Sequence, residues 1–308
     1  MMETKKSERS NCLGIIMAAV MLPALTGATA WTSQDRTFGE SEKVEEAPAH
    51  EAPATQPAEI GPRQEARPQS SDAASQQLVK NYLKVTGGKD AHTRLRNIVA
   101  SGEIRQGNTS KQFRLIETQD GKRQITYTWR LLGRDYEEVY AFDGLKAWSQ
   151  ALKPDFNEAT PFTGPEATHF ISHRWLLQPF VLPRSAHYVF KYQGAARVHG
   201  RPTHVSVGFG KKNERTWFYF DKEKSLLLRW GGYGPIAGKQ EPMDYQAAQF
   251  RRVGSVLLPQ ELQLVAENQV FGRVIFESIE ANQSLDGVDF MMPVTTVPRL
   301  RQRTVEPR

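Results

Sequence analysis

His169 and His173 form the residue pair whose types and spacing most directly suggest chemistry. Four positions apart on a helix, two imidazoles lie one turn apart on the same face, where they could bind zinc or copper. The pair lacks the glutamate of the H-E-x-x-H pattern, and His187, His199 or His204 could complete a site only if the fold brought one of them close. We therefore expect packing or surface histidines and no metal, with His169 and His173 kept as weak candidates.

Other catalytic arrangements are missing from the sequence. Glu137 and Glu138 are adjacent, so on a strand their carboxylates point to opposite faces; Asp286 and Asp289 are interpreted as solvated charges. There is no G-x-S-x-G elbow, P-loop or dinucleotide glycine pattern, and the glycine-rich stretch 231–235 is expected to be a loop. We expect a protein that is not an enzyme and that carries no cofactor.

Aromatic and aliphatic residues on predicted strands are the remaining candidates for a site. Where the other face of a strand is polar, as Arg130 beside Trp129 indicates, the apolar face must be covered by helices or by a ligand. Coverage by the protein's own helices is one interpretation. A concave apolar pocket that accepts an acyl chain is the functional alternative. Its candidate lining residues are Ile125, Tyr127, Trp129, Trp148, Phe218, Phe220, Leu226 and Leu228.

Hydrophobic periodicity predicts the elements that position these residues. Ser71 or Asp72 can cap a helix that runs to Gly87-Gly88, and a short helical turn follows over 90–95. After Asn97 the period becomes two, and glycine-containing turns recur about every dozen residues, as in an antiparallel meander. A loop over 151–165 and a helix over 165–177 precede further strands. The sequence thus predicts an α+β, mainly antiparallel fold of about ten or eleven strands in one curved sheet, with helices against one face.

The first 30 residues have the organisation of a cleavable signal peptide. Basic residues precede an apolar run over 13–25, and Ala28-Thr29-Ala30 fits a cleavage site after Ala30. The apolar run, of about 13 residues, is shorter than the ~20 needed to cross a bilayer; an uncleaved tether in the inner membrane is the alternative. Cys12, the only cysteine of the chain, precedes the apolar run. The mature protein is therefore expected to have no lipid-modified cysteine, disulfide or catalytic thiol.

Composition divides the rest of the chain. Residues 31–75 are rich in Ala, Pro, Glu and Gln and are predicted to be a disordered linker; 76–295 are predicted to form one β domain, and 296–308 a basic flexible tail. The formal net charge of the chain is +6 and its pI is about 9.3. The basic residues are spread widely, which permits weak attraction to an anionic membrane surface but does not favour nucleic acid as a partner.

Six stretches together have a recognisable pattern; they lie at 82–88, 99–104, 141–148, 218–221, 226–229 and 289–293. They resemble the LolA/LolB-like superfamily of outer-membrane lipoprotein-sorting proteins. The resemblance implies an incomplete, curved antiparallel β-barrel of about eleven strands, with helices covering the concave side and an apolar cavity for lipid acyl chains.

The leading hypothesis is a non-catalytic periplasmic carrier that binds a lipid or the acyl chains of a lipoprotein. The alternative is an interaction or sensor module that docks on another protein of the bacterial cell envelope. A metal-dependent enzyme built on His169 and His173 is the third hypothesis.

Overall fold

The computed structural model describes residues 67–152, 158–182, 188–210, 214–236, 239–266 and 269–293. The predicted signal peptide over 1–30, the linker up to residue 66 and the tail over 296–308 lie outside these residues. Of the predicted linker, residues 67–75 are described. Within the described part of the chain, no helix combines the length and the apolar character needed to span a membrane.

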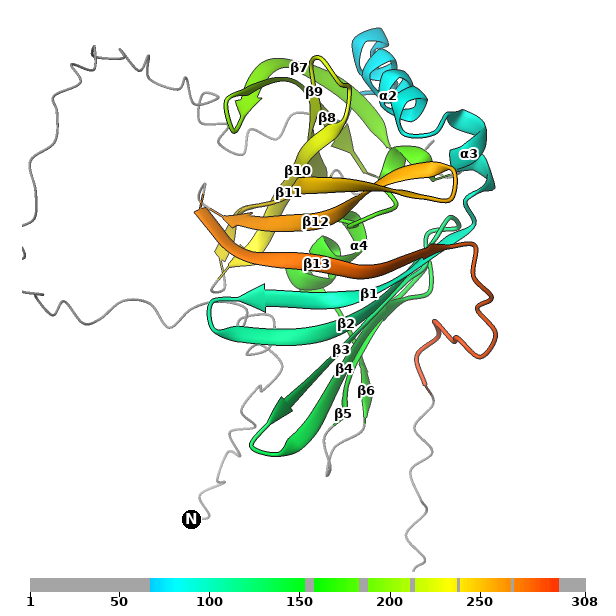
Figure 1. Cartoon of the computed structure of the whole chain (residues 1–308), viewed down its shortest axis with the longest axis vertical. Helices are drawn as coiled ribbons and strands as arrows, with labels where there is room; N and C mark the ends of the chain where they lie inside the picture. The colour runs from blue at the N-terminus through cyan, green and yellow to red at the C-terminus, as the bar shows by residue number, and fades with distance from the viewer. Residues whose placement is uncertain are drawn as a thin grey trace, which may run out of the picture. The chain divides into compact units, whose positions relative to one another are not determined.

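The described residues form one antiparallel sheet of thirteen strands, in the order β6-β5-β4-β3-β2-β1-β13-β12-β11-β10-β9-β8-β7 (Figure 1). The strands are β1 (Asn97–Gln106), β2 (Thr109–Thr118), β3 (Arg123–Leu131), β4 (Arg134–Phe142), β5 (Ala147–Leu152), β6 (Ala159–Pro161), β7 (Val189–Val198), β8 (Arg201–Phe209), β9 (Arg215–Asp221), β10 (Leu227–Ile236), β11 (Lys239–Val253), β12 (Val256–Ala266) and β13 (Gln269–Ala281).

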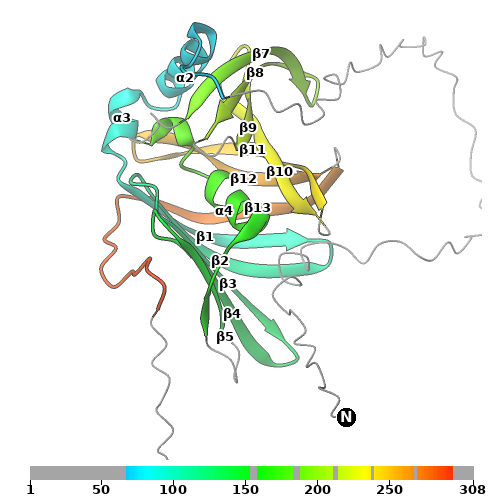
Figure 2. The same cartoon turned by 180° about the vertical axis from the view of Figure 1, so that it is seen from behind.

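Two meanders make up this sheet, and the pairing of β1 with β13 joins them. Strands β1 to β6 follow one another outward from β1, and β7 to β13 return to it. Between the meanders, α4 (Gly164–Ser172) and the 3-10 turn η1 (Pro179–Val181) lie against the inner face of the curved sheet (Figure 2). The sheet is not closed, since β6 and β7 are its two edges. The predicted fold class is confirmed, with thirteen strands in place of about eleven.

The N-terminal helix α2 (Ala73–Val85) is tied to the edge strand β7 by its own cap. The Asp72 carboxylate accepts the backbone N–H of Ser75 at 2.7 Å and that of Tyr192 on β7 at 2.6 Å. Ser71 and Asp72 also make hydrogen bonds to the backbone of Phe190. The predicted cap is therefore correct, and it fixes the helix beside β7. The short helix α3 (Lys89–Arg94) follows, also as predicted.

Three local predictions were wrong. The helix predicted over 165–177 ends at Ser172, because the backbone N–H groups of residues 175–177 bond elsewhere, as described below. The stretch 231–235, predicted as a loop, is part of β10. The loop predicted over 151–165 contains the end of β5, the short strand β6 and the start of α4. In addition, β11 was not predicted.

The sheet has a core on each face. The main cluster fills the inner face, where Phe170, Trp175 and Phe180 from the α4 to η1 segment pack against side chains of the sheet. On the outer face, a small cluster forms around Trp148 and Ala141.

Cross-strand pairing establishes these faces. Ile125 pairs with Tyr140, whereas Gln124 pairs with Ala141 and Ala141 with Trp148. Neighbouring residues of a strand point to opposite faces, so Trp148 lies on the face opposite Ile125.

Candidate functional site

A buried ion pair on the inner face joins β2 to β3. Glu117 and Arg123 are directly opposed in the strand register, with Arg123 Nε 3.2 Å from Glu117 Oε1. The exposed fractions of the two side chains are 0% and 2%, respectively. A pair removed from water to this degree needs further hydrogen bonds to offset its desolvation.

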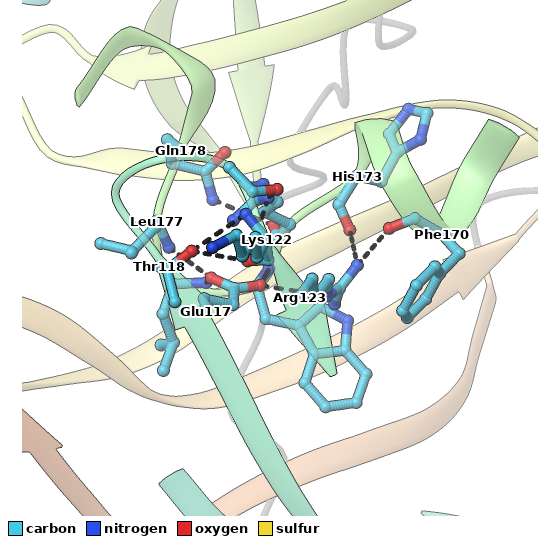
Figure 3. A network of polar contacts seen from close by, with 12 residues as sticks. Glu117, Thr118, Lys122, Arg123, Phe170, His173, Leu177 and Gln178 are labelled. Atoms are coloured by element: carbon cyan, nitrogen blue, oxygen red, sulfur yellow. Dashed lines mark hydrogen bonds and ion pairs between the residues drawn. The ribbon is translucent and has the colours of Figure 1, made fainter. Parts of the chain in front are cut away.

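The segment after α4 supplies those hydrogen bonds (Figure 3). Glu117 accepts the backbone N–H groups of Trp175, Leu176 and Leu177 at 3.1, 3.2 and 2.7 Å. Arg123 donates to the carbonyl oxygens of Phe170 and His173, the latter at 3.1 Å. The carboxylate thus takes N–H groups that a longer helix would have used internally, which explains why α4 ends early. The network holds the segment in place.

The two candidate histidines pack against each other inside this segment. Their ring centroids are 4.3 Å apart, and His169 Nε2 lies 2.9 Å from the hydroxyl of Tyr245 on β11. Burial, with the nearby Arg123 charge, lowers the pKa of both, that of His173 to about 4 and that of His169 well below its usual value. Both rings are therefore neutral at pH 7.

The glycines of β10 make room for these rings. A Cβ on Gly232 would lie 2.6 Å from His173 Nε2, and one on Gly234 would lie 3.1 Å from His169 Nδ1. The glycine-rich stretch is thus a strand whose backbone closely approaches two imidazoles.

The described residues bring no third ligand to this pair. They contain no group of three or more His, Cys, Asp or Glu side chains able to hold a metal ion. His204 hydrogen-bonds Tyr192 at 2.9 Å, and His199 contacts Gln246. His187 lies outside the described residues.

The predicted lining residues are placed in different environments. Ile125, Phe218 and Phe220 belong to the inner cluster, with exposed fractions of 2%, 0% and 1%. A side chain with almost no accessible surface has no water-sized space beside it. These three therefore pack against the protein's own residues, and the α4 to η1 segment occupies the volume predicted for an acyl chain.

The other five do not share one cavity. Tyr127 and Trp129 are half-buried further along β3, and Trp129 stacks on Tyr136 with centroids 5.5 Å apart. Trp148, on the outer face, donates its indole N–H to the carbonyl of Phe290 at 2.8 Å. Of the remaining two, Leu226 is half-buried in the β9–β10 turn, and Leu228 is buried outside both clusters.

A groove of about 1100 Å³ lies at the edge of the sheet, between α2 and the start of β7. This is slightly above the range of about 300 to 1,000 Å³ that is typical of small-molecule sites. Its apolar lining combines Val79 and Leu83 of α2 with Phe180 of η1 and the stretch 188–190. Its polar lining consists of Gln69, Ser70, Ser71, Gln76, Gln77, Lys80, Asn81, Lys84, Gly88 and Lys89. We call this the α2–β7 groove.

The α2–β7 groove was missed because it depends on a long-range contact. The sequence predicts α2 and its apolar positions, including Val79 and Leu83. It contains no local signal that Asp72 binds β7 and thereby places α2 next to Phe190.

A second exposed feature is the tip of the β3–β4 hairpin. Leu131 and Leu132 are 53% and 94% exposed, and Leu132 has a φ of 49°, which a branched side chain rarely adopts. Arg130 and Arg134 flank the two leucines and are exposed. An apolar tip between basic side chains matches the chemistry of an anionic membrane interface.

Comparison with solved structures finds similar sheets at low sequence identity. A domain described as an outer membrane lipoprotein-sorting protein domain, from Vibrio parahaemolyticus, is 10% identical with a TM-score of 0.47, over 69% of this chain and 97% of that chain. A LolA superfamily protein from Nitrosomonas europaea is 7% identical with a TM-score of 0.45, over 68% and 94%. A DUF1329 family protein from Desulfovibrio piger is 12% identical with a TM-score of 0.39, over 68% and 94%.

The similar structures include one described as a lipoprotein-sorting domain and one described as a LolA superfamily protein, the superfamily that the sequence resembles. No protein-family model matches the sequence, and neither does any curated protein. With identities of at most 12% and TM-scores of at most 0.47 among the three, the function has to be inferred from the chain's own residues.

Replacing Glu117 with alanine is expected to lower the free energy of unfolding by about 3 to 5 kcal/mol, because Arg123 would remain buried without its partner. The double variant Glu117→Leu/Arg123→Met should lose less than the sum of the two single variants. Urea unfolding measures both. Asp135→Ala is the control, since it removes an Arg–Asp contact between β3 and β4 whose side chains are 71% and 86% exposed. A Glu117→Ala effect as small as the control would contradict the structural role of the network.

Stability should fall as the pH drops below about 6.5, the usual histidine pKa. In the unfolded chain His169 and His173 take up protons there, whereas in the folded protein their lowered pKa values keep them neutral down to about 4 for His173. Each contributes up to about 1.4 kcal/mol per pH unit within that window. His92, whose pKa burial also lowers, adds in the same direction. Urea unfolding from neutral pH down to about 5 should show this slope, and it should be shallower in His169→Gln/His173→Gln.

Proposed function

We propose that this chain is a non-catalytic binding protein that holds an acyl chain of a lipid or lipoprotein in the α2–β7 groove. The observation that carries the proposal is the groove itself, a lipid-sized hollow whose apolar lining includes Val79, Leu83, Phe180 and Phe190. Each methylene group removed from water there contributes about 0.8 kcal/mol, so a long acyl chain can bind without a specific polar contact.

We place the acyl chain in the α2–β7 groove and not on the inner face, where the sequence led us to expect it. Ile125, Phe218 and Phe220 pack against the chain's own aromatic residues, so an acyl chain could enter there only if the α4 to η1 segment left. The Glu117–Arg123 network opposes that movement. The groove at the sheet edge needs no such rearrangement.

Export to the periplasm is part of the proposal and is supported by the signal-peptide pattern of residues 1–30. A periplasmic protein would encounter lipids at the membranes that enclose this compartment. Docking on another envelope protein remains the alternative, and an empty groove in the purified protein would favour it.

Replacing Val79 with glutamate should weaken acyl binding at least tenfold, because it places a charge on the apolar lining. The probe is a fluorescent monoacylglycerol, which has an acyl chain and no charge, and its affinity is measured by titration. Val85→Glu is the matched control, since Val85 lies on the same helix, is 41% exposed and does not line the groove.

Extraction of the purified protein followed by mass spectrometry adds an independent test. We expect co-purified lipid in the wild type and in Val85→Glu, and less in Val79→Glu. A wild type that is consistently free of lipid and does not bind the probe would overturn the proposed function.

Contact with an anionic membrane is a second candidate activity, favoured by the exposed Leu131 and Leu132 between Arg130 and Arg134. We expect the protein to sediment with vesicles containing phosphatidylglycerol, and Leu131→Ser/Leu132→Asn to reduce the bound fraction several-fold. Asn suits the positive φ of position 132, so the hairpin should keep its shape. Leu145→Ser is the control, because Leu145 is 87% exposed in the β4–β5 turn, at the other end of β4. Equal loss in both variants would argue against a specific role for the tip.

A further inference from the structure

The α2–β7 groove carries a charge pattern that acyl binding alone does not explain. Three lysines line it, Lys80 and Lys84 on α2 and Lys89 at the start of α3. No aspartate or glutamate is among its lining residues. Among its lining residues the groove therefore combines an apolar surface with positive charges and no negative ones.

The positions of the lysines follow from the helix. Lys80 and Lys84 are four residues apart, so they lie one turn apart on the same side of α2. Val79 and Leu83 precede them with the same spacing and line the same groove. Each turn of α2 thus presents one apolar side chain and one ammonium group to the groove. All three lysines are exposed, and within the described part of the chain none forms an ion pair.

We infer that the α2–β7 groove selects lipids with an anionic headgroup, with the acyl chain along Val79, Leu83, Phe180 and Phe190 and the headgroup at Lys80, Lys84 and Lys89. This inference rests on the proposed function and adds the class of ligand. Three cations that form no ion pair within the described residues, in a groove with no aspartate or glutamate among its lining residues, attract a phosphate or carboxylate, and the attraction is screened by salt. The glutamine, serine and asparagine side chains of the groove can donate further hydrogen bonds to headgroup oxygens.

The test compares two lipids that have the same acyl chain and differ in the charge of the headgroup. Lysophosphatidylglycerol carries a net negative charge, whereas lysophosphatidylcholine is zwitterionic. Each competes against the fluorescent monoacylglycerol on the full mature chain. We expect lysophosphatidylglycerol to bind roughly tenfold more tightly at low salt, with a difference that shrinks as salt is added. Glycerol phosphate, which has the headgroup chemistry and no acyl chain, should not compete at the same concentration.

The variant Lys80→Gln/Lys84→Gln/Lys89→Gln should remove the preference, bringing the affinity ratio of lysophosphatidylglycerol to lysophosphatidylcholine close to one. Lys146→Gln/Lys222→Gln/Lys224→Gln changes the net charge equally at exposed positions outside the groove and should keep the preference. The substitutions are on exposed side chains, so both variants are expected to fold, which circular dichroism checks.

The outcomes separate this inference from the function on which it rests. Binding of the uncharged probe without any headgroup preference overturns the anionic selection and leaves acyl binding intact. A preference that persists in the groove variant, or is lost equally in the control variant, overturns the assignment to the three lysines. Competition by glycerol phosphate alone overturns a lipid as the ligand. Failure to bind the uncharged probe overturns the proposed function itself.

Discussion

A carboxylate with no access to water stands at the centre of this structure. Glu117 points from β2 into the buried, mainly apolar inner face, and a charge there must be paired and fully hydrogen-bonded. Arg123, its neighbour across the strands, satisfies only part of this need. The N–H groups of residues 175–177 satisfy the rest, and they can do so only if the chain after α4 lies on the inner face. The hydrogen bonds that one buried carboxylate requires therefore determine where that segment lies.

This placement decides where a ligand could bind. Phe170, Trp175 and Phe180 enter the inner face with the segment and fill it. Phe180 also reaches the α2–β7 groove, so the element that fills the inner face contributes to the apolar lining at its rim. The elements α2 and β7, which form the groove, and the β3–β4 hairpin lie at opposite ends of the sheet in both views (Figures 1 and 2). A membrane contact at the hairpin tip would therefore leave the groove distant from that contact.

Local patterns predicted much of the fold, and long-range contacts account for the errors. The cap at Asp72 and the alternation in β1 and β3 are properties of neighbouring residues. The early end of α4 depends on Glu117, which lies 58 to 60 residues before its backbone partners in the chain, and so could not be seen in the helix's own pattern. The glycines of β10 led us to predict a loop. In the structure they belong to a strand, where the missing side chains leave room for the rings of His169 and His173. β11 has few strong strand formers: it contains Pro242 and three glutamines, and neighbouring strands on both sides hold it. The candidate site was missed for the same reason, since two elements far apart in the chain form it.

The pairing of β1 with β13 has a consequence for how the molecule comes together. Ile98 lies opposite Ala281, so the two meanders cannot be joined until nearly the whole domain has been synthesised. Until then β1 presents an unpaired edge of ten residues, with hydrogen-bonding groups that could pair with another chain. Contacts of such long sequence separation are associated with slow folding. A chain that must stay unfolded while it crosses a membrane would be helped by this delay, and a chain truncated before β13 would be prone to aggregate along the exposed strand.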